Sequence, residues 1–308
     1  MGRPRRMVPV VIVAMVALTS CRSGQSSEAS APVDPATISV ASFNFSESEL
    51  LAEIYSQTLE AGGYPVARSL ELGPRELVVP ALVAGLVDFV PEYAGTAAQF
   101  LRAGRPEPDR QPVETTTALH GALDALPVRA LDAAPAQDAN AFVVRRATAD
   151  RYGLVAVSDL AAVAGSLVFG GPPECLSRPL CLEGLDRVYG ITFGDVVSLD
   201  AGGPLTHQAL TGGGIDVALL FTTDPALDGA ELVELTDDRD LQPPENVVPL
   251  VHEDVVARWG DEMVARIDDT SARLTTTVLR RLNEQVAAGR DDVPTIAKQW
   301  LTSEGLLT

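Results

Sequence analysis

Lysine is almost missing from this chain of 308 residues: it occurs once, at Lys298, and histidine and cysteine occur only three times each. Lysine and arginine together number 23 against 42 aspartates and glutamates, which gives a formal net charge of −19. Proteins that bind nucleic acid neutralise its phosphates with a basic surface. The shortage of positive charge therefore argues against a nucleic-acid partner, and the excess of acids by itself identifies no other partner.

The motifs of the common enzyme classes are also missing. The chain has no G-x-S-x-G nucleophile elbow, no Walker loop, no H-E-x-x-H and no C-x-x-C. The histidines, His120, His207 and His252, are scattered along the chain, so a zinc site has no cluster of ligands. We expect no cofactor, no metal and no catalysis. An exported enzyme on a two-lobed fold is the alternative, which turnover of a bound solute would support.

Long apolar runs are confined to the N-terminus. Residues 7–18 (MVPVVIVAMVAL) are apolar but too few to cross a bilayer as a helix, and three arginines precede them. The following LTSC places small side chains before Cys21 and resembles the lipobox of bacterial lipoproteins, in which the cysteine thiol receives a diacylglycerol. We predict a lipoprotein signal peptide over residues 1–20 and lipidation of Cys21. An ordinary secretory signal with an incidental cysteine is the alternative.

The segment after this cysteine is polar. Residues 21–36 are rich in serine, alanine and proline and show no apolar period, which predicts a flexible tether. No later stretch is a long run free of charges and loop-forming residues. The predicted location is therefore outside the cytoplasm, with the protein anchored by its lipid to the outer face of the cytoplasmic membrane, at the cell surface or in the periplasm.

Two cysteines remain besides the one predicted to carry lipid. Cys175 and Cys181 stand close together in PPECLSRPLCLEG. In an exported protein, a disulfide that closes this small loop is the economical interpretation. A zinc site is the alternative, but it would need two more ligands nearby.

Strand and helix patterns alternate along the rest of the chain. Strands are predicted at residues 37–42, 65–72 and 87–91, and helices at 46–61, 75–84, from 96 onward and at 113–126. Ser46 and Glu49 form a capping box for the first helix. After residue 140 short strands and helices alternate again, a return strand covers 245–251, and a long helix is predicted over about 262–288. This alternation predicts α/β layers with mostly parallel sheets.

Two stretches share one pattern of glycine turn, acid, apolar strand and polar turn. They are ALVAGLVDFVPEYAGT at 81–96 and ALTGGGIDVALLFTTD at 209–224. The pattern indicates one β/α unit that is used once in each of two lobes, although the stretches are too short to be a sequence repeat. If each lobe presents such a turn to the other, the ligand site is the cleft between the lobes.

Seven stretches occur in one order and together resemble a known family. They are SFNFSESELLAEIY, LGPRELVVPALVAGLVDFVPEYAGT, YGLVAVSDL, FGGPPE, GLDRVYG, LLFTTD and QPPENVVPLV. They resemble the substrate-binding proteins of quaternary-amine ABC importers, of the glycine betaine, choline and carnitine type. The resemblance implies the type II periplasmic-binding-protein fold, with two α/β lobes joined by two crossover strands and a ligand cleft between them. Lobe I is expected at 37–139 and 248–308, and lobe II at 140–247.

The resemblance also implies site residues. Tyr93 matches the cage tyrosine of the P-E-Y motif, and Asn140 matches the asparagine of an N-x-Y motif whose aromatic is Phe142 here. Glu76 falls where relatives carry an acidic pocket residue, with an ordinary first-turn acid of a helix as the alternative. The full set of expected ligand-binding residues is Asn44, Glu76, Tyr93, Thr96, Asn140, Phe142, His207, Glu245 and Asn246.

The aromatic cage of the family is incomplete in this chain. Relatives have a tyrosine pair in the return strand, where this chain has Glu245 and Asn246. A cation over an aromatic ring is worth roughly 0.5–2 kcal/mol, and a nearby carboxylate can offset the loss of a ring for a cationic ligand. The expected function is capture of an osmolyte-like solute, namely glycine betaine, choline or a related quaternary amine, in osmoprotection. The partners are an ABC permease and its ATPase. A receptor or sensor of the same fold, or a binder of another polar solute, is the alternative.

Overall fold

The computed structural model describes residues 2, 36–102 and 115–307. Apart from Gly2, the predicted signal peptide lies outside these ranges, as do Cys21 and all but the last residue of the predicted tether. Within the described part of the chain, no helix combines the length and the apolar character needed to cross a membrane.

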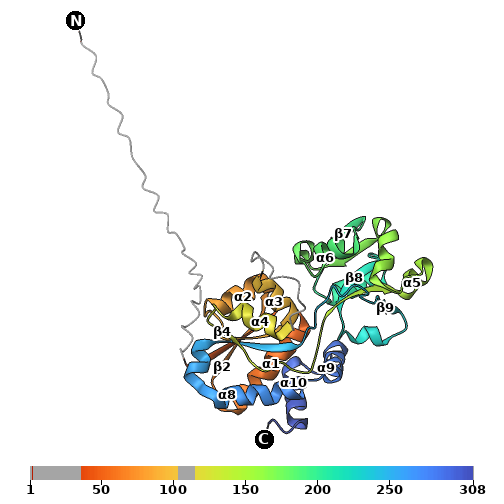
Figure 1. Cartoon of the computed structure of the whole chain (residues 1–308). Coiled ribbons are helices and arrows are strands. Elements are labelled where there is room, and N and C mark those ends of the chain that lie inside the picture. The colour runs from red at the N-terminus through yellow and green to blue at the C-terminus, as the bar shows by residue number, and fades with distance from the viewer. Residues whose placement is uncertain (1, 3–35, 103–114, 308) are drawn as a thin grey trace. The chain divides into compact units, whose positions relative to one another are not determined.

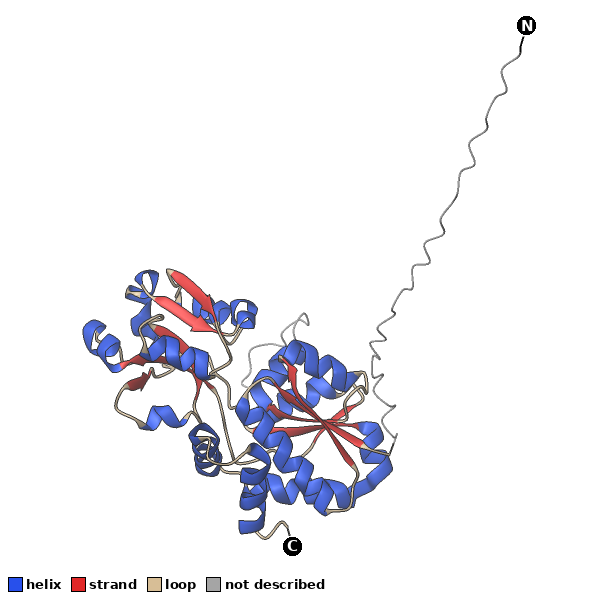
Figure 2. Cartoon of the chain, turned by 180° about the vertical axis from the view of Figure 1, so that it is seen from behind, coloured by secondary structure: helices blue, strands red, loops and turns tan. Residues whose placement is uncertain are grey.

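The first sheet has the strand order β2-β1-β3-β10-β4. β1 pairs in parallel with β2 and β3, whereas β10 runs antiparallel to both β3 and β4. Helices cover both faces of this sheet, as Figure 2 shows. The strands are β1 (Ile38–Phe43), β2 (Val66–Gly73), β3 (Phe89–Tyr93), β4 (Val128–Ala130) and β10 (Val247–His252). The helices are α1 (Ser46–Ala61), α2 (Arg75–Val83), α3 (Ala94–Arg102), α4 (Thr115–Leu123), α8 (Glu253–Arg273), α9 (Thr276–Ala288) and α10 (Val293–Ser303).

The second sheet repeats this plan with the order β7-β6-β8-β5-β9. β6 pairs in parallel with β7 and β8, and β5 runs antiparallel to β8 and β9. Figure 1 shows β7, β8 and β9 together in the part of the chain coloured green to cyan. Its strands are β5 (Asn140–Arg145), β6 (Val168–Gly171), β7 (Asp195–Ser198), β8 (Val217–Phe221) and β9 (Leu232–Glu234). Its helices are α5 (Arg146–Tyr152), α6 (Leu182–Gly184) and α7 (Pro204–Thr211). Short 3₁₀ helices lie at Val157–Ala162, Ala164–Ser166, Pro173–Ser177 and Pro225–Asp228, and a short π-helix lies at Leu185–Tyr189. We call the parts built on the first and second sheets the first and second lobes.

The two sheets place equivalent strands in equivalent positions. β3 and β8, the strands of the two similar stretches, are each third in their sheet, and β10 and β5, the strands that follow the two crossings between lobes, are each fourth. In each sheet the other four strands run in one direction and only the fourth runs against them. The α/β class and the repeated β/α unit are therefore confirmed. The sheets are mostly parallel, as expected, but the two crossover strands β10 and β5 run antiparallel to their neighbours, which the sequence did not predict.

The boundary between β3 and α3 differs from the prediction. β3 continues through Pro91 to Tyr93, and α3 begins at Ala94 rather than at residue 96. A proline ends a strand where its missing N–H is needed. Here Pro91 lies opposite Pro249 of β10, so neither residue has a donor to offer the other. Tyr93 is therefore the last residue of β3, and its pairing with β10 fixes the direction of its side chain.

Two predicted helix boundaries are also corrected. Ser46 is the first residue of α1 and not its cap: Phe45 holds the cap position and no side chain caps the helix there. The predicted helix over 262–288 is two helices. Leu274 is extended after α8, and the Thr275 side chain accepts a hydrogen bond from the Val278 N–H at the start of α9.

The predicted disulfide between Cys175 and Cys181 is confirmed, with 5.3 Å between the two Cα atoms. Both cysteines are buried in the core of the second lobe. Because the bond is anchored in that core, it fixes the segment 172–181, which we call the disulfide loop.

Candidate functional site

A cavity of about 370 Å³ lies between the two lobes. The first lobe lines it with the ends of β1 and β3, the start of α2 and the first two turns of α3. The second lobe contributes the disulfide loop, residues 199–201 and two side chains of β8, and the first crossover contributes Asp138 and Asn140. A cleft between lobes, of a few hundred cubic ångströms and largely apolar, is typical of a small-molecule site.

Four aromatic side chains, Phe43, Phe45, Tyr93 and Phe221, form what we call the aromatic cluster, and all four line the cavity. Phe45 is at its centre. Its ring centroid lies 6.0 Å from that of Phe43, 6.1 Å from that of Tyr93 and 5.4 Å from that of Phe221. Phe221 belongs to the second lobe, so the cluster joins the two walls of the cavity. The electron-rich faces of such rings attract cations.

Tyr93 presents its ring, rather than a free hydroxyl, to the cavity. Its hydroxyl donates to Glu47 Oε1 over 2.7 Å, and its side chain is buried. Burial and the negative charge of Glu47 raise the pKa of Tyr93 well above its ordinary value. The tyrosine at the end of β3 is therefore a fixed and neutral wall of the site.

A buried ion pair supports the first-lobe wall. Arg75 donates from Nε to Glu92 Oε1 over 2.7 Å and from Nη2 to Glu92 Oε2 over 2.9 Å. Glu92 is fully buried and also accepts the backbone N–H of Tyr93. The guanidinium carbon of Arg75 lies 5.1 Å from the ring centroid of Phe43. This pair therefore holds two members of the aromatic cluster in place.

A second ion pair crosses from lobe to lobe. Arg178, in the disulfide loop, donates from Nε and Nη2 to the two carboxylate oxygens of Glu76 over 3.1 and 2.9 Å. Partial burial acts to raise the pKa of Glu76, but the hydrogen bonds from Arg178, the backbone N–H at the start of α2 and the positive charges of Arg178 and Arg75 together outweigh it, so the pKa is lowered. Glu76 lies in the first turn of α2 and also lines the cavity. Glu76 is therefore both a residue of the cavity lining and an acid in the first turn of a helix.

Glu245 lies behind the cavity wall and serves the start of α3. Its carboxyl accepts the backbone N–H groups of Gly95 and Thr96 over 3.0 and 3.1 Å, as well as the Thr96 hydroxyl. No side chain fits at Gly95, because an added Cβ would lie 2.4 Å from Pro243 Cγ. Burial raises the pKa of Glu245 to about 7.

The raised pKa of Glu245 predicts a pH-dependent stability. The folded chain holds this proton up to about pH 7, whereas an unfolded glutamate releases it near 4.5. The free energy of unfolding that the proton contributes therefore falls as the pH rises from about 4.5 to 7, by roughly 3 kcal/mol. Glu245→Gln, which keeps the acceptor oxygen, should lose this dependence in urea titrations at a series of pH values. Glu262→Gln, on the exposed face of α8, is the matched control and should follow the unmutated protein.

The structure brings five of the nine expected ligand residues to the cavity: Asn44, Glu76, Tyr93, Thr96 and Asn140. Asn140 is held there by hydrogen bonds from its side-chain amide to the Leu180 carbonyl and to Gln242 Oε1.

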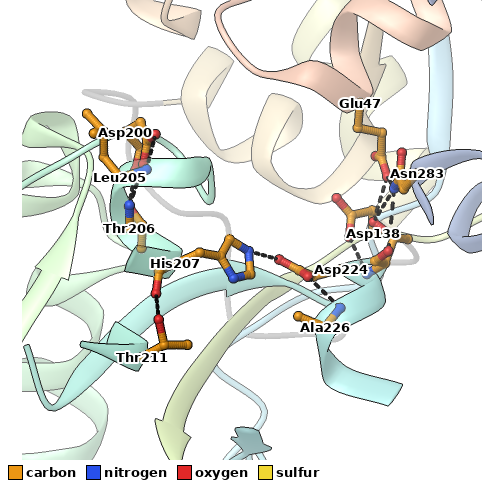
Figure 3. A network of polar contacts seen from close by, with 11 residues as sticks. Glu47, Asp138, Asp200, Leu205, Thr206, His207, Thr211, Asp224, Ala226 and Asn283 are labelled. Atoms are coloured by element: carbon orange, nitrogen blue, oxygen red, sulfur yellow. Dashed lines mark hydrogen bonds and ion pairs between the residues drawn. The ribbon is translucent and has the colours of Figure 1, made fainter. Parts of the chain in front are cut away.

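The other four are not among the described residues that line the cavity. Phe142 is packed in the core of the second lobe. His207 pairs with Asp224 across 2.7 Å (Figure 3), a bond that raises the pKa of His207. Asn246 donates to the Ala134 carbonyl. Glu245, as described, binds the start of α3.

Many other residues line the cavity without having been in the expected set, among them Phe45, Phe221 and Arg178. The first two stand inside the quoted stretches SFNFSESELLAEIY and LLFTTD, so a search for any aromatic residue in these stretches would have found them. In the described ranges, no three histidine, cysteine or acidic side chains come together as metal ligands.

The chain is similar to known binding proteins along most of its length. The family described as the substrate-binding domain of ABC-type glycine betaine transport systems matches residues 36–303. The glycine betaine-binding protein YehZ of Escherichia coli (strain K12) is 26% identical over 277 residues, which cover 84% of this chain and 88% of that protein. A glycine-betaine-binding protein of Pseudomonas aeruginosa is 27% identical over 291 residues, covering 88% of this chain and 89% of that protein.

A solved structure agrees on the fold. The crystal structure described as a glycine betaine/carnitine/choline ABC transporter matches 87% of this chain and 99% of its own, with a TM-score of 0.67 and 23% identity. The expected type II periplasmic-binding-protein fold is thereby confirmed. Since the family match spans far more than half of the sequence, the chain belongs to the family of substrate-binding domains of ABC-type glycine betaine transport systems.

Proposed function

We propose that this chain captures a small quaternary amine, glycine betaine or choline, in the cavity between its lobes and delivers it to an ABC permease. The observation that carries the proposal is the aromatic cluster, in which rings from both lobes line one cavity beside carboxylates. The names of the two bacterial relatives support the same class of ligand.

Energetics favour a cation in this cavity. Each ring face contributes roughly 0.5–2 kcal/mol to a bound quaternary ammonium. The family resemblance implied Tyr93 and Phe142 as cage rings, but the rings that line the cavity beside Tyr93 are those of Phe43, Phe45 and Phe221 in the aromatic cluster, together with Phe100. We therefore propose that phenylalanines take the place of the tyrosines that the family resemblance led us to expect.

Capture requires the lobes to separate and close. We propose hinges near Asn140 and Val247, where the chain crosses between lobe I (37–139 and 248–308) and lobe II (140–247). Both lie at the first residue of a crossover strand, which supports this division. The cross-lobe contacts of Phe45 with Phe221 and of Glu76 with Arg178 would break on opening.

The identity of the solute can be tested without choosing it beforehand. Protein purified from its own cells without added ligand is denatured, and the released small molecules are identified by mass spectrometry. Recovery of a quaternary amine in proportion to protein supports the proposal. Recovery of a different solute in the same proportion would overturn it.

The interlobe ion pair predicts how the ligand's charge is selected. Glu76→Gln should free Arg178 to bind a ligand carboxylate, and it removes a negative charge that attracts cations. We expect choline to bind several-fold more weakly and glycine betaine to bind equally well or better, as measured by calorimetry. Glu183→Gln, on the exposed Glu183–Arg187 pair, is the control. Equal small losses for both ligands would mean that Glu76 acts only at the start of its helix.

We also propose that residues 1–20 are a signal peptide and that Cys21 carries the lipid that anchors the protein outside the cytoplasmic membrane, with 21–36 as the tether. The support is the LTSC stretch after an apolar core. Cys21→Ala should abolish incorporation of labelled fatty acid and release the protein from the membrane fraction. Cys175→Ala is the control for loss of a cysteine. Labelling that persists in the Cys21→Ala protein would contradict the anchor.

A further inference from the structure

A pair of buried carboxyl groups, Glu47 and Asp138, lies at the junction of the lobes (Figure 3). Glu47 is in the first turn of α1 and accepts three hydrogen bonds from neutral groups. Its Oε1 accepts the Tyr93 hydroxyl over 2.7 Å, and its Oε2 accepts the Thr223 hydroxyl over 2.6 Å and the Asn283 amide over 2.5 Å. Glu47 is therefore the acceptor in all three of these hydrogen bonds.

Asp138 is the member of the pair that lines the cavity. It is 5% exposed, and its Oδ1 accepts the Thr223 backbone N–H over 3.0 Å and the Thr222 hydroxyl over 3.3 Å. Burial, and then the charge of the neighbouring Glu47, raise the pKa of Asp138 well above its ordinary value. Two carboxyl groups that lie near each other in a buried site do not both ionise readily, because the second negative charge is unfavourable there, so Asp138 keeps a proton.

The charged side chains on the elements packed around the pair are engaged with each other. They form the pairs Arg75–Glu92, Arg280–Asp228 and His207–Asp224. Arg280 also donates to the Thr222 carbonyl. Within the ranges that the structure describes, no basic side chain forms an ion pair with Glu47 or Asp138. A proton, or a positive charge brought in by a ligand, can therefore neutralise the second carboxylate.

We propose that a cationic solute entering the cavity displaces the shared proton of the Glu47–Asp138 pair, so that capture of a cation releases a proton to solvent. This inference rests on the proposed function. The contacts of the pair with the cavity support this proposal. Tyr93, which lines the cavity, is hydrogen-bonded to Glu47, and Asp138 lines the same cavity. The O–H bond of the carboxylic acid breaks, the proton passes to buffer, and the carboxylate left behind faces the ammonium group. Net charge in the cavity is unchanged.

The proposed proton release fixes the direction in which affinity for a cation changes with pH. A bound cation favours the ionised carboxyl and lowers its pKa, so affinity for the cation rises with pH below the pKa of the empty site. One linked proton gives at most about a tenfold change per pH unit. Glycine betaine, which carries its own carboxylate, should release less than choline does.

The test is calorimetry of the full chain, purified as the cell exports it, with choline and with glycine betaine. Titrations in buffers of different ionisation enthalpy between pH 6 and 8 count the protons released. We expect release of a substantial fraction of one proton with choline and less with glycine betaine. Asp138→Asn should release none and should bind choline with a pH-independent affinity. Asparagine mimics the protonated acid, since its amide oxygen can accept the Thr223 N–H and it carries no charge, so the fold is retained.

Two further variants separate the outcomes. Glu174→Gln removes another carboxylate of the cavity lining and should retain the proton release, whereas Glu47→Gln should lose it. Choline binding without proton exchange, or proton release that persists in Asp138→Asn, would overturn this inference and leave the proposed function standing. Failure of both ligands to bind the unmutated protein would overturn the proposed function, and this inference with it.

Discussion

Replacing Phe45 with alanine is expected to weaken the binding of choline or glycine betaine by roughly 30- to 150-fold. Phe45 is the central ring of the aromatic cluster and the one that meets the second lobe at Phe221. The variant loses one ring face for the ammonium group and the ring contacts that hold the other faces in place, together about 2–3 kcal/mol. Calorimetric titration of the variant measures this loss directly.

The control for Phe45→Ala is Phe193→Ala. Phe193 is a buried ring that packs on Phe169 in the core of the second lobe, at a centroid distance of 5.1 Å. Its loss should lower stability to a similar extent and leave the Kd nearly unchanged. A Kd for Phe45→Ala within twofold of the unmutated protein would place the ligand elsewhere.

Replacing Arg75 with methionine should lower the free energy of unfolding by about 3–5 kcal/mol. The substitution leaves the Glu92 carboxylate fully buried and without its two charged hydrogen bonds. Its remaining contact, from the Tyr93 N–H, does not neutralise the charge. Urea denaturation followed by circular dichroism measures the loss.

Two comparisons test the reason for this loss. Arg187→Met breaks an exposed pair with Glu183 and should change stability by no more than about 0.5 kcal/mol. The double variant Arg75→Met, Glu92→Met buries no charge and should recover much of the stability. A double variant as unstable as Arg75→Met alone would show that lost packing of the arginine, not the stranded carboxylate, is responsible.

The fold was largely predictable from the sequence, because the signals for it are local. Alternating strands and helices identify the α/β class, and the two similar stretches identify β3 and β8, which indeed take equivalent positions. The direction of β5 and β10 was not predictable, since it depends on the path by which the chain re-enters each sheet. The break at Leu274 and Thr275 was missed because the helical period of apolar residues continues across it.

The site was predictable only where one segment determines it. Tyr93 ends a strand at a turn, and the structure places it on the cavity wall. Phe142 lies two residues into β5, where the second-lobe core already covers the strand, whereas Asn140 at its first residue remains at the cavity. Glu245 accepts a hydrogen bond from the backbone of α3, 150 residues earlier in the chain, so it does not face the cavity. Arg178 gains its partner Glu76 only where the lobes meet, which no single stretch encodes.

The most direct test of binding in the cavity is calorimetry of the exported chain with choline and glycine betaine, beside the Phe45→Ala protein. We predict saturable binding of at least one of the two at one site per chain, with a large loss of affinity in the variant. A heat of dilution alone for both ligands, with the protein shown to be folded and free of bound solute, would contradict the assignment of this cavity to quaternary amines.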